Sequence, residues 1–133
     1  MILAKEFVRS DLAREMGLFC NPFAPLLFRE VNLCLFTSPP PDFSTSCTDR
    51  PLIVQFGASN PLDFARAAEM VKPYCDGVDL NCGCPQTWAI SAGIGCKLMS
   101  SPELVRDMVR AAKERCGEEF SISVKIRIHH DIQ

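Results

Sequence analysis

Short apolar runs bounded by turn residues recur in the second half of the chain, and each of them predicts a buried strand. The runs are 51–56 (PLIVQF), 77–81 (GVDLN) and 121–128 (SISVKIRI). In the third run polar residues alternate with Ile and Val, so one strand face carries the cations Lys125 and Arg127. Two arrangements remain open for these cations. They face a barrel interior or a crevice at the strand's carboxyl end, or they face water on a one-sided sheet.

Between these runs, apolar residues recur at the three- and four-residue spacing of amphipathic helices. We predict one helix in residues 60–74, which begins at an Asn60 N-cap. We predict a second in residues 101–117, capped by Ser101 at its start and ended by a glycine. The predicted buried stripes are Phe64, Ala68 and Val71 in the first helix and Leu104, Val105, Met108, Val109 and Ala112 in the second.

The order strand–helix–strand–helix–strand predicts an α/β fold with parallel strands and right-handed crossovers. Residues 12–50 do not share this regularity, because their apolar clumps have no steady period and five prolines interrupt them. We interpret this segment as an irregular insert or linker.

Composition narrows the class of protein. A chain of 133 residues is enough for one modest domain, and 47% hydrophobic residues argue against intrinsic disorder. A net charge of −2 gives no overall field that gathers nucleic acid, although a local basic patch is averaged away in that figure. Charges throughout the first fifteen residues exclude a secretory signal, and no run approaches the ~18 apolar residues of a membrane span. We therefore expect an intracellular protein, cytoplasmic or nuclear, whose eight cysteines are reduced thiols.

The stretch NCGCPQ, residues 81–86, is the strongest candidate for chemistry. Glycine and proline break the second strand here, so Cys84 lies in a loop at the end of a strand, where α/β folds bind ligands. A thiol at such a position can act as a nucleophile or as a general acid. Since no histidine is near in sequence, a neutral thiol that donates a proton fits better. The alternatives are two small buried thiols, or a metal site seeded by Cys82 and Cys84, for which no further ligands stand at zinc spacing.

Four further features carry weaker signals. The glycines of SAGIGCK, residues 91–97, suit a flexible turn better than a phosphate cradle. Gln55 interrupts an apolar strand and either satisfies a neighbour or binds the amide edge of a ligand. For Trp88, a packing role and a stacking role are both possible interpretations. The two histidines at 129–130 are expected to belong to a frayed terminus.

Taken together, these residues resemble the tRNA-dihydrouridine synthases, in particular the dihydrouridine synthase 4-like branch. The stretches that carry the resemblance are MILAKEFVRS (1–10), PLIVQFGAS (51–59), GVDLNCGCPQTWA (77–89), GIGCKLMSSPELVRDMV (93–109) and SISVKIRIH (121–129). The resemblance covers residues 1–11 and 49–131, about 70% of the chain. Its most specific part is the N-x-G-C-P-Q motif with Lys-Ile-Arg downstream.

The resemblance implies a TIM (β/α)8 barrel that holds FMN at its carboxyl-terminal mouth, followed by a helical RNA-binding domain. It implies NADPH-dependent reduction of uridine to dihydrouridine in the D-loop of tRNA, at positions 20a and 20b. Cys84 would then donate a proton to the uracil ring. Gln55 and Lys125 would hold the flavin, and Asn81 and Arg127 would hold the flipped uracil. No metal is implied, and the oligomeric state is left open.

The same resemblance implies that this chain is incomplete, because a family barrel needs eight strands and roughly 250 residues. We expect residues 1–11 to be a remnant of an early barrel strand, and residues 51–133 to be a partial FMN-binding barrel of about four strands in all. We expect such a half barrel to expose an apolar face, and the chain alone not to bind FMN tightly. The alternative function is a truncated α/β fragment without enzymatic activity.

Overall fold

The computed structural model describes residues 1–9, 45 and 48–128. The expectation for residues 12–50 therefore lies almost wholly outside the described residues, as does that for the histidines at 129–130. Within the described part of the chain, no helix has the length and apolar character needed to cross a membrane.

A four-stranded parallel sheet organises the described residues, and its strand order follows the sequence order. The strands are β1 (Ile2–Leu3), β2 (Ile53–Gly57), β3 (Gly77–Cys82) and β4 (Ser121–Ile126). The prediction of an α/β fold with about four parallel strands is confirmed, and the open sheet is what a partial barrel requires. The predicted third strand is two residues shorter than expected, since β4 ends at Ile126.

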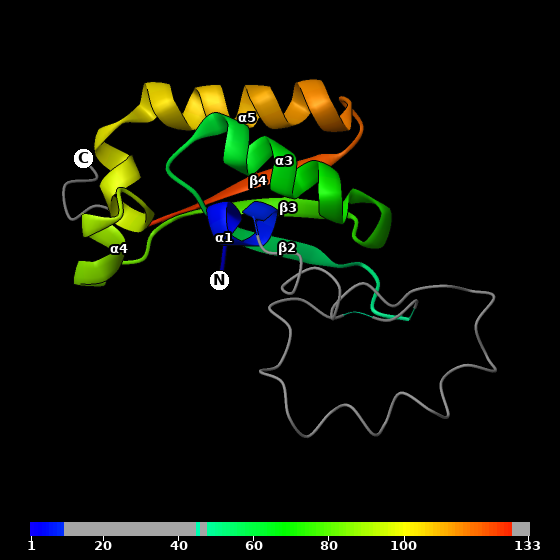
Figure 1. Ribbon diagram of the computed structural model, residues 1–133, viewed down its shortest axis with the longest axis horizontal. Coiled ribbons are helices and arrows are strands. Elements are labelled where there is room, and N and C mark those ends of the chain that lie inside the picture. Colours follow the sequence, from blue (N-terminus) through cyan, green and yellow to red (C-terminus); the bar gives the residue numbers. More distant parts are fainter. Residues whose placement is uncertain (10–44, 46–47, 129–133) are drawn as a thin grey trace, which may run out of the picture.

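The longer helices lie on one side of this sheet, as Figure 1 shows for α3 and α5. They are α1 (Ala4–Arg9), α3 (Pro61–Val71) and α5 (Pro102–Cys116). Helix α3 packs against both α1 and α5. Three short elements complete the fold: η2 (Lys72–Tyr74), α4 (Thr87–Ser91) and η3 (Gly95–Ser100).

Local sequence signals account for most helix boundaries. The Asn60 side chain accepts a hydrogen bond from the Leu62 backbone N–H at 2.7 Å, so the predicted cap of α3 is confirmed. The predicted cap of α5 is wrong in one respect, because Ser101 occupies the N-cap position without a side-chain capping bond. Its ψ of 63° lies outside the extended region from which a serine side chain reaches the first turn. Gly117 ends α5 with φ 87°, a conformation that favours glycine.

The core fills the space between the helices and the sheet. Phe7 of α1 and Phe56 of β2 are fully buried, with ring centroids 5.5 Å apart. The predicted stripe of α3 is confirmed, since its three members have no exposed surface. In α5 only Met108 and Ala112 of the predicted stripe are fully buried, and the others are partly buried. Along β2 and β3 every second residue joins this core, which leaves the alternate residues on the opposite face.

The face that the helices leave uncovered is mainly polar. Gln55, Asp79 and Ser123 are in register across β2, β3 and β4, and Asn81 is in register with Lys125. The expectation of an exposed apolar face does not hold for this side of the sheet, because the inward residues of these strands are polar. Exposed apolar surface lies instead at the end of β4, where Ile126 is 67% exposed. The cations of the third strand stand on the same side as this polar face, which is the interior side if the sheet closes into a barrel.

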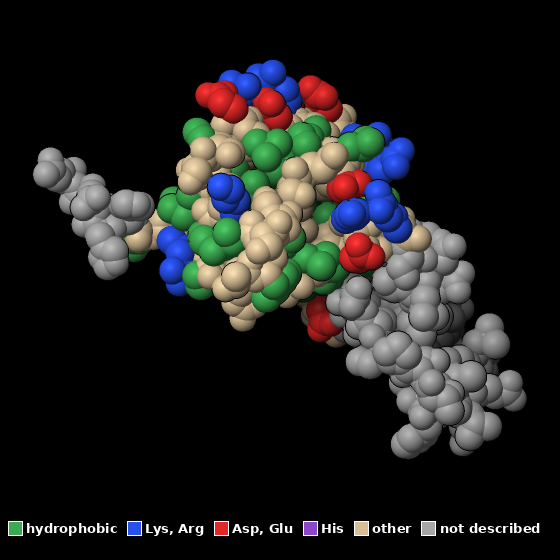
Figure 2. All heavy atoms as spheres, turned by 60° about the vertical axis from the view of Figure 1, so that its left-hand side comes forward, with side chains coloured by type: hydrophobic (Ala, Val, Ile, Leu, Met, Phe, Trp, Pro, Cys, Tyr) green, Lys and Arg blue, Asp and Glu red, His purple; other side chains and the backbone are tan. Residues whose placement is uncertain are grey.

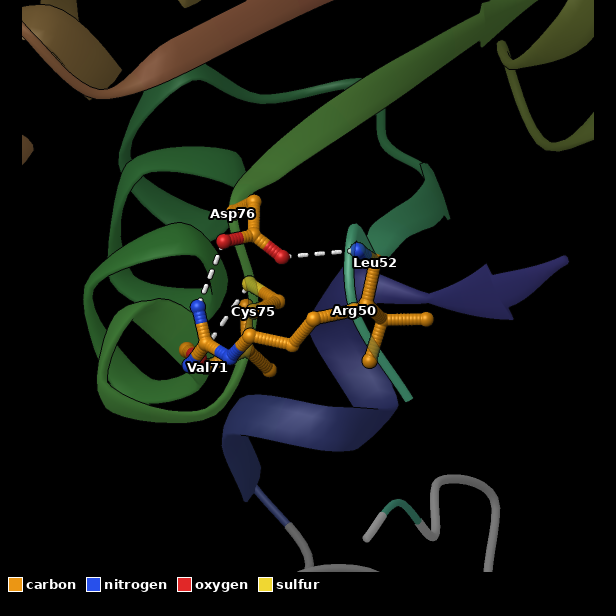
Figure 3. A network of polar contacts seen from close by, with 5 residues as sticks. All are labelled: Arg50, Leu52, Val71, Cys75 and Asp76. Atoms are coloured by element: carbon orange, nitrogen blue, oxygen red, sulfur yellow. Dashed lines mark hydrogen bonds and ion pairs between the residues drawn. The ribbon is translucent and has the colours of Figure 1, made fainter. Parts of the chain in front are cut away.

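A polar network joins the start of β2 to the start of β3 (Figure 3). Asp76 accepts a hydrogen bond from the Leu52 backbone N–H at 2.7 Å and one from the Arg50 guanidinium at 2.5 Å. Cys75 donates to the Val71 carbonyl at 3.3 Å. The hydrogen bond from Leu52, together with Arg50, lowers the pKa of Asp76 below its ordinary value of 3.8.

This network predicts an acid-dependent loss of stability. Because the folded-state pKa of Asp76 is depressed, its stabilisation is present in full above about pH 4 and is lost as the pH falls through the lower folded pKa. We expect Asp76→Asn to lower the melting temperature at pH 7, and the difference from the unmodified chain to shrink toward pH 2. Thermal melts followed by circular dichroism across this range measure the difference. Asp107→Asn is the matched control, since Asp107 pairs, among the described residues, only with its exposed neighbour Arg106. An equal effect of both substitutions would contradict the prediction.

Candidate functional site at the strand ends

The site is built around Asn81, whose side chain is the one polar side chain among the buried residues of the described chain. Its side-chain oxygen accepts hydrogen bonds from the backbone N–H groups of Gly83 and Cys84, both at 3.0 Å. Its Nδ2 donates to Gln55 Oε1 at 2.8 Å. Asn81 therefore fixes the turn that carries Cys84 and ties that turn to the neighbouring strand.

The hydrogen bonds continue across the uncovered face of the sheet. Gln55 Nε2 donates to Asp79 Oδ2 at 2.7 Å, and Ser123 Oγ donates to Asp79 Oδ1 at 2.7 Å. Asp79 and Ser123 were missed as site residues at the level of the sequence. The signal was present, because Asp79 is a carboxylate in the middle of an otherwise apolar strand. Each amide keeps one N–H of its two after these bonds, so Gln55 and Asn81 both retain a donor for a ligand.

The cysteines of the described chain fall into two groups. Cys75, Cys82 and Cys116 are buried, whereas Cys84 and Cys96 are partly exposed. Burial raises the pKa of Cys75 and of Cys82 to about 11, with the charge of Asp79 adding to the effect at Cys82. Cys82 is therefore a packing residue, and Cys84 is the thiol of the NCGCPQ motif that a ligand can reach. Among the described residues, no three His, Cys, Asp or Glu side chains gather closely enough to hold a metal ion.

A second backbone segment holds the Cys84 loop from the other side. The Cys96 N–H donates to the Cys84 carbonyl at 2.9 Å, which brings η3 against the loop. Gly95 has φ 66°, and a Cβ placed on it would lie 2.5 Å from the Cys84 carbonyl oxygen. Gly93 also has a positive φ, 73°, but a Cβ there would meet nothing closer than 3.5 Å. The glycines of residues 91–97 therefore serve a tight turn, and Gly95 in addition permits a close approach.

The two predicted cations border the same turn. Lys125 is the Cα partner of Asn81 across β3 and β4. Arg127 follows β4, and its Cγ would lie 3.5 Å from a Cβ placed on Gly83. Both cations are exposed, and neither forms an ion pair with any described residue. The five predicted site residues thus gather at the carboxyl ends of β2, β3 and β4.

Trp88 lies apart from this group on α4, directly after the loop. It is 50% exposed, so it lies outside the core, and the alternatives of a packing role and a stacking role both stay open. Its indole N–H donates to Gln86 Oε1.

This arrangement suits a ligand that is anionic or electron-rich and that has hydrogen-bonding edges. Two cations without carboxylate partners offer positive charge, and two amide N–H groups offer directional donors. The partly exposed thiol of Cys84 stands at the rim, where it can exchange a proton with a bound molecule.

Comparison with protein families identifies a match over most of the chain. The model of the dihydrouridine synthase family matches residues 36–133. This range contains the NCGCPQ motif, η3 and the whole of β4.

Individual relatives give the same result. The chain is 53% identical over 91 residues, 68% of its length, to the tRNA-dihydrouridine(20a/20b) synthase [NAD(P)+] of Schizosaccharomyces pombe. It is 47% identical over 134 aligned positions, its full length, to the tRNA-dihydrouridine(20a/20b) synthase [NAD(P)+]-like protein of Homo sapiens. A tRNA-dihydrouridine(16/17) synthase [NAD(P)(+)]-like protein of Rattus norvegicus is 42% identical over 99% of the chain. The chain spans 28%, 34% and 24% of the length of these relatives, respectively.

Proposed function

The chain belongs to the dihydrouridine synthase family, and we propose that it forms the proton-donating part of a flavin-dependent enzyme that reduces uridine to 5,6-dihydrouridine in tRNA. The observation that carries the proposal is the Cys84 turn, which Asn81 fixes beside Lys125 and Arg127, two cations that form no ion pair with the described residues. Two 20a/20b relatives, at 53% and 47% identity, support positions 20a and 20b of the D-loop as the target, while the identities to two others, 41% and 40%, overlap the 42% to the 16/17 relative.

The residues of the uncovered sheet face fit FMN. Lys125 supplies a positive charge that a carboxylate of the described chain does not already neutralise, and Gln55 keeps one amide N–H for the edge of the flavin ring. When bound and reduced by NADPH, FMN would supply the hydride that the uracil ring accepts. The names of the relatives agree with a nicotinamide reductant.

The chain's own residues supply the rest of the reaction. Cys84 donates its thiol proton to the carbon of uracil next to the one that receives hydride, so that the ring gains two hydrogens in all. Solvent then returns a proton to the Cys84 thiolate. Asn81, through its remaining N–H, and Arg127 hold the uracil carbonyl oxygens and keep the ring beside the thiol.

The observed pairing also supports a proposal about organisation. Strand β1 is parallel to β2 and is followed directly by α1, as expected if residues 1–11 are a remnant of an early barrel strand. We propose that residues 51–133 form the part of the family barrel that carries the thiol and the two cations.

A segment exchange tests the proposed function. Residues 51–128 replace the matching segment of the Schizosaccharomyces pombe relative, and the exchanged enzyme acts on tRNA that lacks dihydrouridine. Mass spectrometry of the nucleosides released by hydrolysis measures the product. We expect the amount of dihydrouridine formed by the exchanged enzyme to be within about tenfold of the amount formed by the parent enzyme. A folded exchanged enzyme that binds FMN and yields no dihydrouridine would contradict the proposal and favour the alternative of a fragment without activity.

A separate prediction concerns the 133-residue chain by itself. Its sheet offers one wall to a flavin, whereas a closed family barrel surrounds the ring. We expect FMN fluorescence to be quenched only at chain concentrations above about 10 μM, which corresponds to a weak complex. Sub-micromolar affinity would contradict this prediction. Lys125→Met, which removes a predicted flavin contact, is expected to weaken the residual quenching further.

A further inference from the structure

We propose that Trp88 is a stacking platform for a single-stranded RNA base next to the uridine that is reduced, and that Lys97 contacts the phosphate backbone beside it. The inference rests on the proposed function. It adds a second surface that contacts the RNA substrate, outside the site that contains the Cys84 thiol.

The exposure of Trp88 is the first observation. Trp88 and Ile90 of α4 are 50% and 39% exposed, while Ala89 between them is fully buried and holds the helix on the protein. The hydrogen bond from the indole N–H to Gln86 fixes one edge of the ring. A large aromatic side chain that is exposed and fixed in this way offers a flat surface at little entropic cost to a base.

The position of α4 is the second observation. Helix α4 begins three residues after Cys84, and η3 packs against it. Figure 1 shows α4 at the carboxyl ends of the strands, at the end of the molecule where the Cys84 loop lies. This surface is therefore open to a nucleotide that precedes or follows a uridine held at Cys84.

The distribution of charge is the third observation. The whole chain has a net charge of −2, yet no acidic residue occurs in residues 80–102 or 120–128. Those two segments carry only Lys97, Lys125 and Arg127, a formal charge of +3. In Figure 2, which brings this end of the molecule forward, the middle and left of the face carry apolar and a few basic side chains without acidic ones, and the acidic side chains lie at the upper and right borders, where basic ones also gather. Positive charge at the end of the molecule that also carries an exposed aromatic ring favours single-stranded nucleic acid as the occupant.

The chain provides its own probe, because Trp88 is its only tryptophan. In the unmodified 133-residue chain without flavin, we expect a short oligouridylate to quench tryptophan emission with a saturating curve. Inorganic polyphosphate of matched charge is expected to compete with the RNA without quenching the emission, because it cannot stack. Vesicles that contain phosphatidylserine are the comparison for an interfacial membrane role.

Variants separate stacking from charge. Followed by anisotropy of a labelled oligouridylate, Trp88→Ala is expected to weaken binding about 10-fold, and Trp88→Phe to keep most of it. Trp88→Ala should leave the salt dependence of binding unchanged. Lys97→Gln should reduce the slope of the logarithm of the binding constant against the logarithm of the salt concentration by the amount that corresponds to about one phosphate contact. Far-UV circular dichroism checks that each variant is folded.

The outcomes are distinguishable from those of the proposed function. Absence of RNA quenching, equal quenching by polyphosphate, or a blue shift with vesicles but not with RNA would overturn the stacking role. In that case the segment exchange still reports on uridine reduction. If RNA quenches Trp88 while the exchanged enzyme forms no dihydrouridine, the RNA surface is supported and the reductase proposal fails.

Discussion

Replacing Cys84 with alanine is expected to lower uridine reduction by the exchanged enzyme by about 10²- to 10⁴-fold, the range in which a positioned general acid contributes. The flavin is expected to stay bound. The reason is geometric, because two backbone hydrogen bonds hold the Cys84 turn: the Cys84 N–H donates to Asn81 Oδ1, and the Cys84 carbonyl accepts from the Cys96 N–H. Removal of the sulfur breaks neither bond, so the proton donor is lost while the flavin face remains.

Single-turnover reduction followed by nucleoside mass spectrometry measures the loss, and the flavin absorbance of the same preparation measures cofactor content. Cys96→Ala is the matched control, because Cys96 is also a partly exposed thiol and contacts the loop through its backbone. We expect it to retain activity within about threefold, as for a surface substitution. If Cys84→Ala lost flavin together with activity, Cys84 would have a structural role and the assignment would be wrong.

The Gly95→Ala substitution is expected to have the largest effect on the loop itself. Alanine at φ 66° is strained, and its Cβ would stand 2.5 Å from the Cys84 carbonyl oxygen, a backbone atom that cannot turn aside. Strain in the left-handed region costs about 1–2 kcal/mol, and the forced displacement of the loop adds about 1–3 kcal/mol. We therefore expect a loss of roughly 2–5 kcal/mol in the free energy of unfolding.

Gly93→Ala separates these two contributions. Gly93 has a similar φ of 73°, but an alanine there meets only Ser59 Cβ at an ordinary distance of 3.5 Å. We expect it to cost only the conformational strain, about 1–2 kcal/mol, in urea unfolding followed by circular dichroism. Equal losses at both positions would show that the close approach of η3 to Cys84 does not occur in solution.

Local features of the sequence predict much of this fold because they act within a single element. Asn60 caps α3, and residues at helical spacing bury its inner stripe, as the pattern indicates. Ser101 shows the limit of such signals. The residue type is right for a cap, but capping also depends on the backbone angle, and Ser101 has ψ 63° at the junction of η3 and α5.

The candidate site was predictable only in part, because its remaining members depend on strand register. Gln55, Asn81, Cys84, Lys125 and Arg127 could be assigned from motif and resemblance. Asp79 and Ser123 join them only when β2, β3 and β4 are aligned, which no local pattern specifies. The exposure of Trp88 follows from the short helix α4, an element that the sequence pattern did not predict.

The central claim is that the thiol of Cys84 and the ammonium of Lys125 serve one flavin pocket at the strand ends. Alkylation of Cys84 by iodoacetamide in the exchanged enzyme, located by peptide mass spectrometry, tests it most directly. We expect saturating FMN to slow alkylation of Cys84 by about tenfold or more, as a bound ligand excludes the reagent. At the same FMN concentration, Lys125→Met should remove most of this protection. Alkylation of Cys84 at the same rate with and without bound FMN would contradict the claim.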